Sequence, residues 1–211
     1  MEKYFKETNK RRNQGKAQIF FTQETNLDPS REEEIKDLAK YYKFHFALAF
    51  AKANNDGTHY GGTLTLVDEK TAEIKNDYTL DENGGALVTE LDWSGAKITV
   101  VNIYAPAKPV QRIDFFNEIK NKIKPDMIMM GDWNCVPDVL LDVQSPDPSK
   151  YKNFGGALLE SIMHRNGLRD FRREQLSSDK EPTRIGTSNQ KNSTNNSPAS
   201  KSKVNQRWPQ E

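Results

Sequence analysis

KITVVNIYAP at residues 97–106 and DMIMMGDWN at residues 126–134 are two short apolar runs that each end in polar residues. Such runs are typical of strands that lie in a core and emerge from it at one end. The segment between them, Arg112 to Ile123, repeats apolar residues at helical spacing and predicts an amphipathic helix. Pro125 ends that helix. This half of the chain therefore reads as strand, helix, strand.

Similar runs precede and follow this region. ALVTEL at 86–91 is joined to the run at 97–106 by a short turn and predicts an antiparallel hairpin. Further strands are expected at AQIFF (17–21), at 44–50 and at TLTLV (63–67). Further helices are expected after Asp28-Pro29-Ser30 and from Phe154 to Met163. This order indicates the α/β class, with helices outside two mixed sheets of the α+β type.

The 211 residues suit one domain with tails. Residues 1–16 are polar and mostly basic, and they are expected to form a separate N-terminal segment. The folded domain is expected at 17–176. Residues 177–211 include the low-complexity stretch GTSNQKNSTNNSPASKSK, which lacks apolar residues to pack, and this tail is expected to be disordered.

Composition limits the classes of function. Lys and Arg number 31 against 30 Asp and Glu, so any contact with nucleic acid must rest on local charge. The single cysteine, Cys135, excludes an intrachain disulfide and a cysteine-rich zinc site, and it fits a reducing compartment. No run is long enough to span a bilayer, and the N-terminus is not a secretory signal. An intracellular protein without a membrane partner is expected, in either nucleus or cytoplasm.

Polar side chains gather where the predicted strands end. Glu24 follows the first strand, Tyr104 closes the strand at 97–104, and Asp132 and Asn134 follow the last. A carboxylate can hold Mg²⁺ through oxygen, an Asp can orient or deprotonate a water, and an Asn or Tyr can hydrogen-bond a phosphate oxygen. No nucleophilic Ser or Cys motif and no glycine-rich nucleotide loop accompanies them. This set predicts phosphodiester hydrolysis.

Four segments in order, FTQET, HYGGTLTLV, VNIYAP with Arg112 downstream, and MIMMGDWN, resemble the endonuclease/exonuclease/phosphatase superfamily. The resemblance covers about 19–176 and implies a four-layered α/β sandwich. It implies that Glu24 binds a metal, Mg²⁺ or Mn²⁺, and that Tyr104, Asp132 and Asn134 are catalytic. VNIYAP with a downstream Arg is similar to the apurinic-endonuclease-like branch, including the nucleases of non-long-terminal-repeat retrotransposons. QET and the Gly-Gly before a strand are more similar to the retrotransposon type. The sphingomyelinase and inositol-phosphatase branches tend to have histidine where Tyr104 stands.

Two parts of the family pattern are missing. The family begins with a strand that carries an Asn, whereas no apolar run surrounds Asn9 or Asn13. The family ends with a Ser-Asp-His-type motif, whereas the last histidine here is His164, within a predicted helix. The resemblance therefore implies a domain truncated at both ends, with little or no activity of its own. A sheet truncated in this way favours a partner that completes or covers it.

Several residues keep two interpretations. Trp133 either packs beside the site or stacks on a base. His59 either lies in a solvated loop or touches phosphate, and Arg112 is a further candidate for a nucleic-acid contact.

Three functions stay open: a DNA endonuclease of the retrotransposon type that contacts backbone phosphates, a non-catalytic nucleic-acid-binding relic, and a small-molecule phosphatase of the same fold. Tyr104 argues against the third, and the missing histidine argues for the second.

Overall fold

The computed structural model describes residues 1–53, 57–143, 147 and 150–175. Two main sheets run through the molecule. The first is antiparallel, with strand order β1-β5-β2, and consists of β1 (Ile19–Gln23), β2 (Phe44–Ala49) and β5 (Thr63–Asp68). The second, in the order β6-β7-β8-β9, consists of β6 (Glu73–Thr79), β7 (Ala86–Trp93), β8 (Ala96–Tyr104) and β9 (Met127–Asp132). Strands β7 and β8 form the expected antiparallel hairpin, and β9 lies parallel to β8.

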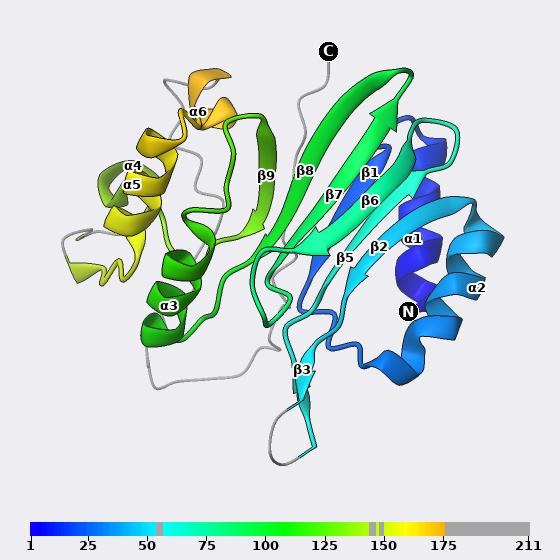
Figure 1. Cartoon of the computed structure of the whole chain (residues 1–211), viewed down its shortest axis with the longest axis horizontal. Helices are drawn as coiled ribbons and strands as arrows, with labels where there is room; N and C mark the ends of the chain where they lie inside the picture. The colour runs from blue at the N-terminus through cyan, green and yellow to red at the C-terminus, as the bar shows by residue number, and fades with distance from the viewer. Residues whose placement is uncertain (54–56, 144–146, 148–149, 176–211) are drawn as a thin grey trace, which may run out of the picture.

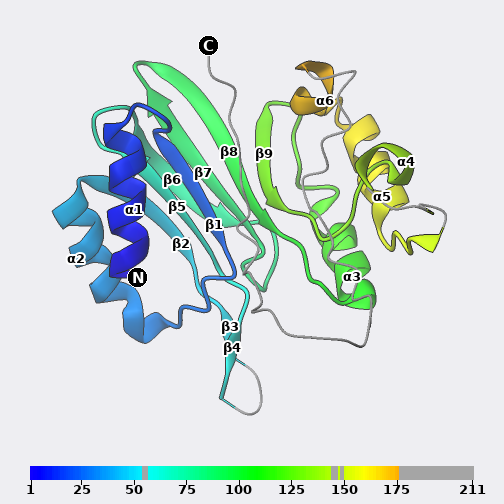
Figure 2. The same ribbon diagram turned by 180° about the vertical axis from the view of Figure 1, so that it is seen from behind.

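Helices cover the outer faces of both sheets (Figures 1 and 2). The first sheet is flanked by α1 (Glu2–Asn13) and α2 (Glu32–Tyr42), with the short 3-10 turn η1 (Pro29–Arg31) before α2. On the side of the second sheet lie α3 (Pro109–Ile119), α4 (Val139–Asp142), α5 (Gly156–Arg165) and α6 (Phe171–Gln175). The order of layers is helix, sheet, sheet, helix, which confirms the predicted four-layered α/β sandwich. A two-stranded ribbon of β3 (Lys52–Ala53) and β4 (His59–Tyr60) projects from one end.

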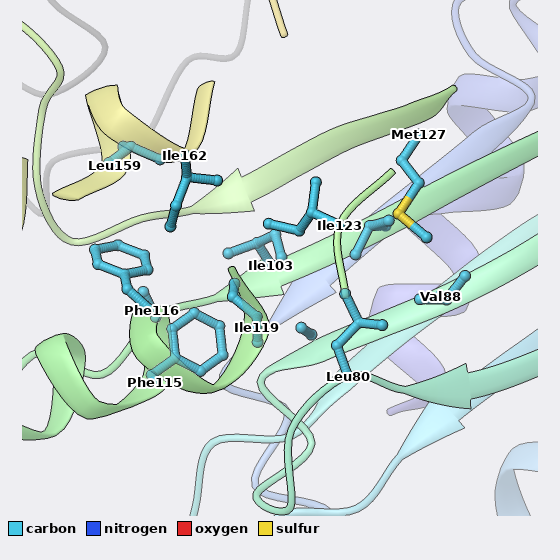
Figure 3. Packing of buried hydrophobic residues seen from close by; sticks show 13 residues of the cluster. Leu80, Val88, Ile103, Phe115, Phe116, Ile119, Ile123, Met127, Leu159 and Ile162 are labelled. Atoms are coloured by element: carbon cyan, nitrogen blue, oxygen red, sulfur yellow. The ribbon is translucent and has the colours of Figure 1, made fainter. Parts of the chain in front are cut away.

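Apolar side chains fill each of the three gaps between layers. Strand β5 shows how: Leu64 and Leu66 pack against α1 and α2, whereas Val67 packs against the second sheet, because successive side chains of a strand point to opposite faces. The gap between the second sheet and α3 and α5 is filled around Ile103 and Phe116 (Figure 3). None of the described helices is long and apolar enough to cross a membrane.

The basic N-terminal segment packs into this fold. Its residues form α1, where the side chain of Phe5 is 0% exposed and lies against the rings of Tyr42 and Phe44. Arg12 donates hydrogen bonds to the carbonyl oxygens of Tyr42 and Lys43 at 2.9 Å each. The domain start expected at residue 17 therefore leaves out a helix that is part of the core.

Two strands differ from the expectation. DMIMM was predicted as a buried strand, but β9 borders the second sheet within the described chain, and Ile128 is 51% exposed. β6 was not predicted, because it borders the other side of that sheet and only Ile74 and Tyr78 among its seven residues are apolar and half-buried. The prediction for 177–211 falls outside the residues that the structure describes.

Candidate active site at the strand ends

The parallel pairing of β8 and β9 brings Tyr104 and Asp132 together. The two residues are direct partners in the register, and the backbone N–H of Ala105 donates to the Asp132 carbonyl at 2.8 Å. Gly131, just before Asp132, has φ of +143°, and a Cβ built there would lie 2.0 Å from the carbonyl oxygen of Ile103. Only glycine fits this position, so the close approach of the two strands depends on it.

The first sheet supplies Glu24 to the same place. Glu24 follows β1 with φ of +53°, and the turn after it is fixed by the backbone N–H of Asn26, which donates to the Gly61 carbonyl at 2.9 Å. The Tyr104 hydroxyl donates to Oε1 of Glu24 at 2.6 Å. This hydrogen bond joins the end of the first sheet to the end of the second.

Asn134 completes the group from the turn after β9. Its backbone N–H donates to Oδ1 of Asp132 at 2.9 Å, and its side-chain Nδ2 donates to the Ala105 carbonyl at 2.7 Å. These contacts fix the Asp132 carboxylate relative to the end of β8. Glu24 and Asp132 are both exposed, and a ligand can therefore reach them. The structure thus gathers Glu24, Tyr104, Asp132 and Asn134, predicted from separate segments, at one edge of the sandwich.

The environment of Tyr104 keeps its phenol protonated. Partial burial raises the pKa of Tyr104, and the hydrogen bond to Glu24 and the negative charges of Glu24 and Asp132 raise it further. A phenol in this state serves as a hydrogen-bond donor at neutral pH and not as a base. Burial also raises the pKa of the neighbouring Cys135 thiol to about 11. A thiol that stays neutral is a poor nucleophile, in agreement with the absence of a cysteine-nucleophile motif.

The exposed carboxylates fit a magnesium site of the open kind. Within the described ranges, no three His, Cys, Asp or Glu side chains gather as a metal cage would require. Mg²⁺ commonly binds one or two carboxylates and takes its remaining ligands from water and substrate phosphate. Glu24 and Asp132 can supply such a pair of oxygen ligands.

The other candidate residues, Trp133, His59 and Arg112, differ in their exposure and in their contacts. Trp133 is half-buried and its ring lies 6.2 Å from that of Phe116, a packing contact. His59 is half-buried on β4. Arg112 is only 5% exposed, and it donates to the carbonyl oxygens of Phe154, Pro106 and Ala107 at 2.9 to 3.0 Å. This placement favours a structural role for Arg112 in the loop that follows Tyr104.

No histidine in the described part of the chain hydrogen-bonds to the four gathered side chains. His45 lies on β2 and His59 on β4. His164 lies on α5, where it lines a shallow pocket of about 490 Å³ with Glu160 and Arg173. That pocket belongs to the helical layer and contains none of the four residues.

Sequence reasoning did not foresee the part that Gly131 plays. The signal was available, since a glycine directly between a strand and an Asp marks a place where backbone comes close. The buried side chain of Asn102 was a second omission. It is 0% exposed, and its hydrogen bonds to β1 and β5 place it between the two sheets.

Comparison with known proteins agrees with the architecture. Residues 7–158 match the endonuclease/exonuclease/phosphatase family. An AP endonuclease from Archaeoglobus fulgidus is similar with a TM-score of 0.58 and 14% identity, over 84% of this chain and 77% of that one. The endonuclease domain of TRAS1, a telomere-specific non-LTR retrotransposon, has a TM-score of 0.48 and 19% identity, over 76% of this chain and 65% of that one.

A third similar structure is ANGEL2, a 2',3'-cyclic phosphatase, with a TM-score of 0.45 and 17% identity, over 65% of this chain and 45% of that one. The chain thus spans less than two thirds of the TRAS1 domain and of ANGEL2. A search of curated proteins finds no match. At 14% identity the likeness to the AP endonuclease is one of fold, and chemistry must be argued from the site.

Proposed function

Because the chain belongs to the endonuclease/exonuclease/phosphatase family, we propose that it is a metal-dependent phosphodiester hydrolase that acts on DNA. The observation that carries the proposal is the meeting of Glu24, Tyr104 and Asp132 at the ends of three strands. Hydrolysis of a phosphodiester needs oxygen ligands for a cation, a group that activates water and a donor to the phosphoryl oxygens. These three side chains supply all of them.

Each residue has a role that follows from its contacts. Glu24, with Asp132 beside it, would hold Mg²⁺ or Mn²⁺, which when bound polarises a phosphoryl oxygen and offsets developing charge. Asp132 would orient and deprotonate the attacking water. Tyr104 has one hydroxyl hydrogen, which it donates to Glu24 here; once Glu24 binds the cation, that hydrogen would be donated to the phosphoryl group instead. Asn134 fixes the Asp132 carboxylate and offers its own amide to the phosphate.

DNA is the substrate class that the sequence favours, through contacts with backbone phosphates. Tyr104 stands where the phosphatase-like branches tend to carry histidine, and the QET and VNIYAP segments are similar to the retrotransposon type. His59 and Trp133 are proposed as additional contacts to nucleic acid. Arg112 would contribute by fixing the backbone that follows Tyr104.

A second candidate is a nucleic-acid-binding domain of the same fold with little or no hydrolysis. It is favoured because no described histidine hydrogen-bonds to the four gathered side chains, whereas the family resemblance implies a catalytic histidine there. Loss of one preorganised partner typically costs about 10²–10³ in rate. The same four side chains would then bind a phosphate group without cleaving its ester.

Nicking of supercoiled plasmid separates the two candidates. We expect the purified chain to nick plasmid slowly with Mg²⁺, to stop in the presence of a chelator, and to lose activity in Asp132→Ala and Glu24→Gln. Equal nicking by Asp132→Ala would reveal a contaminating nuclease. Binding of a labelled duplex without nicking would support the second candidate. Hydrolysis of a small phosphate ester with no action on DNA would instead support a small-molecule phosphatase.

A further inference from the structure

The side chain of Asn102 lies between the two sheets, where its neighbours along β8 are apolar. Val100, on the same face of β8, packs with apolar residues of both sheets, whereas Val101 and Ile103 face α3 and α5. Asn102 is 0% exposed. An amide in such a place is costly unless its polar atoms are paired. Its partners therefore indicate what it does there.

Three hydrogen bonds tie Asn102 to the first sheet. Its Nδ2 donates to the carbonyl oxygens of Thr22 on β1 at 3.2 Å and of Leu64 on β5 at 3.1 Å. Its Oδ1 accepts from Nε2 of Gln23 on β1 at 2.6 Å. Thr22 and Leu64 are direct partners in the register of β1 and β5. One side chain from the second sheet is thus bonded to two adjacent strands of the first.

This three-bond contact lies next to the proposed active site on both strands. Gln23, the last residue of β1, immediately precedes Glu24, and Asn102 is two residues before Tyr104 on β8. A strand advances by about 3.3 Å per residue, so the contact is within about 7 Å, measured along each strand, of the Glu24–Tyr104 hydrogen bond. Apolar packing between sheets has little directional preference, whereas hydrogen bonds fix the relative position of the strands that they join.

We propose that Asn102 is a positioning residue for the hydrolysis, holding the Glu24 carboxylate and the Tyr104 phenol in register across the gap between the sheets. The inference rests on the proposed function for its effect on rate. Its structural part, that the Glu24–Tyr104 hydrogen bond depends on Asn102, can be tested without any activity. Gln23 acts with Asn102 as the partner from β1.

The test compares Asn102→Leu, which keeps the bulk and removes the amide, with Val101→Ala. Val101 is the adjacent residue on β8, is equally buried and faces the opposite layer, which makes it a control for lost stability alone. Misplacement of about 1 Å can cost roughly 10²-fold in rate. We expect Asn102→Leu to lower kcat by about 10- to 100-fold with less than about a threefold change in KM. Val101→Ala should keep kcat within about twofold.

Crystal structures of both metal-free variants give the second readout. The Tyr104–Glu24 hydrogen bond should be lost or lengthened in Asn102→Leu and kept in Val101→Ala. If Asn102→Leu does not fold, Gln23→Leu removes only one of the three bonds, and we expect it to give a smaller decrease of kcat in the same direction. Full kcat and an intact Tyr104–Glu24 hydrogen bond in Asn102→Leu, or in Gln23→Leu where Asn102→Leu does not fold, would overturn the proposal. An equal loss of kcat in Val101→Ala would overturn it as well.

The two readouts separate this inference from the proposed function. If the wild-type chain hydrolyses no phosphodiester, the proposed function fails, and the crystal structures still decide whether Asn102 positions Glu24 and Tyr104. If the wild type is active and Asn102→Leu is unchanged in both readouts, only this inference fails.

Discussion

The hydroxyl of Tyr104 makes a hydrogen bond that joins two residues of the proposed active site. It donates to Glu24, the proposed metal ligand, and Asp132 lies opposite it in the register. Both carboxylates favour the protonated phenol. The proposed role of Tyr104 as a donor to phosphate uses the same hydroxyl that donates to Glu24, and replacing that hydroxyl tests both contacts.

Tyr104→Phe should lower kcat by about 10²-fold, because one preorganised donor to the phosphoryl group is removed. The same variant tests the raised pKa. A raised folded-state pKa of Tyr104 contributes stability below the usual value of about 10 and loses it as pH rises beyond that value. Wild type should therefore lose stability more steeply than Tyr104→Phe above about pH 10. Urea unfolding on both sides of that pH measures the difference, and identical slopes would contradict it.

Gly131→Ala should destabilise the protein by about 3 kcal/mol, because of both its φ of +143° and the close Ile103 carbonyl. Gly95→Ala is the matched control, since Gly95 also has positive φ, +87°, but nothing lies within 4 Å of its added Cβ. We expect Gly95→Ala to lower the free energy of unfolding by about 1–2 kcal/mol. Urea unfolding measures the free energy of unfolding of both variants. Equal losses of stability would show that the contact with β8 is not the reason why residue 131 is a glycine.

Helix α1 shows how far the folded unit extends toward the N-terminus. Phe5 is 0% exposed in the layer that α1 and α2 share with the first sheet. We expect Phe5→Ala to cost about 3–5 kcal/mol, as for a large core aromatic. Tyr41→Ala, which removes a ring that is 77% exposed on α2, should change stability by no more than about 0.5 kcal/mol. Thermal and urea unfolding measure both variants, and a Phe5→Ala variant as stable as wild type would exclude α1 from the cooperative unit.

The strands with a strong apolar pattern were predictable, and those at the sheet borders were not. TLTLV forms the central strand of the first sheet, and its neighbours bury both of its faces. β6 and β9 border the second sheet, where one side is open and polar side chains are tolerated. Residues 1–16 were not predicted to pack because one buried aromatic, Phe5, anchors a helix that is otherwise polar. The spacing of apolar residues predicts which positions are buried, and β6, β9 and α1 have few buried apolar residues.

Each residue of the candidate site was predicted from the sequence, but the hydrogen bonds between these residues were not. Glu24, Tyr104, Asp132 and Asn134 each follow an apolar run, a local pattern that sequence reveals. The hydrogen bonds that hold them depend on which strands become neighbours. Pairing of β8 with β9, and contact of β1 with β8 across the gap, are long-range properties that periodicity does not encode. Asn102 belongs to this class, since its partners are 38 to 80 residues away along the chain.

Charge over the chain as a whole sets an expectation for binding to DNA. The net charge is only +1. Many surface cations already pair with a carboxylate on the same helix, such as Lys6 with Glu2 at 2.8 Å and Lys36 with Glu32 at 2.9 Å. Such pairs reduce the positive field that a phosphate backbone would meet. Arg12, from the basic cluster of the N-terminal segment, is bound to backbone carbonyls and is withdrawn from the surface.

We therefore expect DNA binding to be weak, to weaken further with salt, and to depend little on sequence. Each neutralised phosphate contributes about −0.9 to the slope of log affinity against log salt for duplex DNA. Three contacts would lower the affinity roughly 40-fold between 50 and 200 mM salt. Fluorescence anisotropy with two duplexes of unrelated sequence, at both salt concentrations, measures the salt dependence of the affinity and the preference for one DNA sequence over the other. Affinity that hardly changes with salt would exclude binding led by backbone phosphates. A large difference between the duplexes would show that the chain reads base edges, which phosphate contacts alone cannot do.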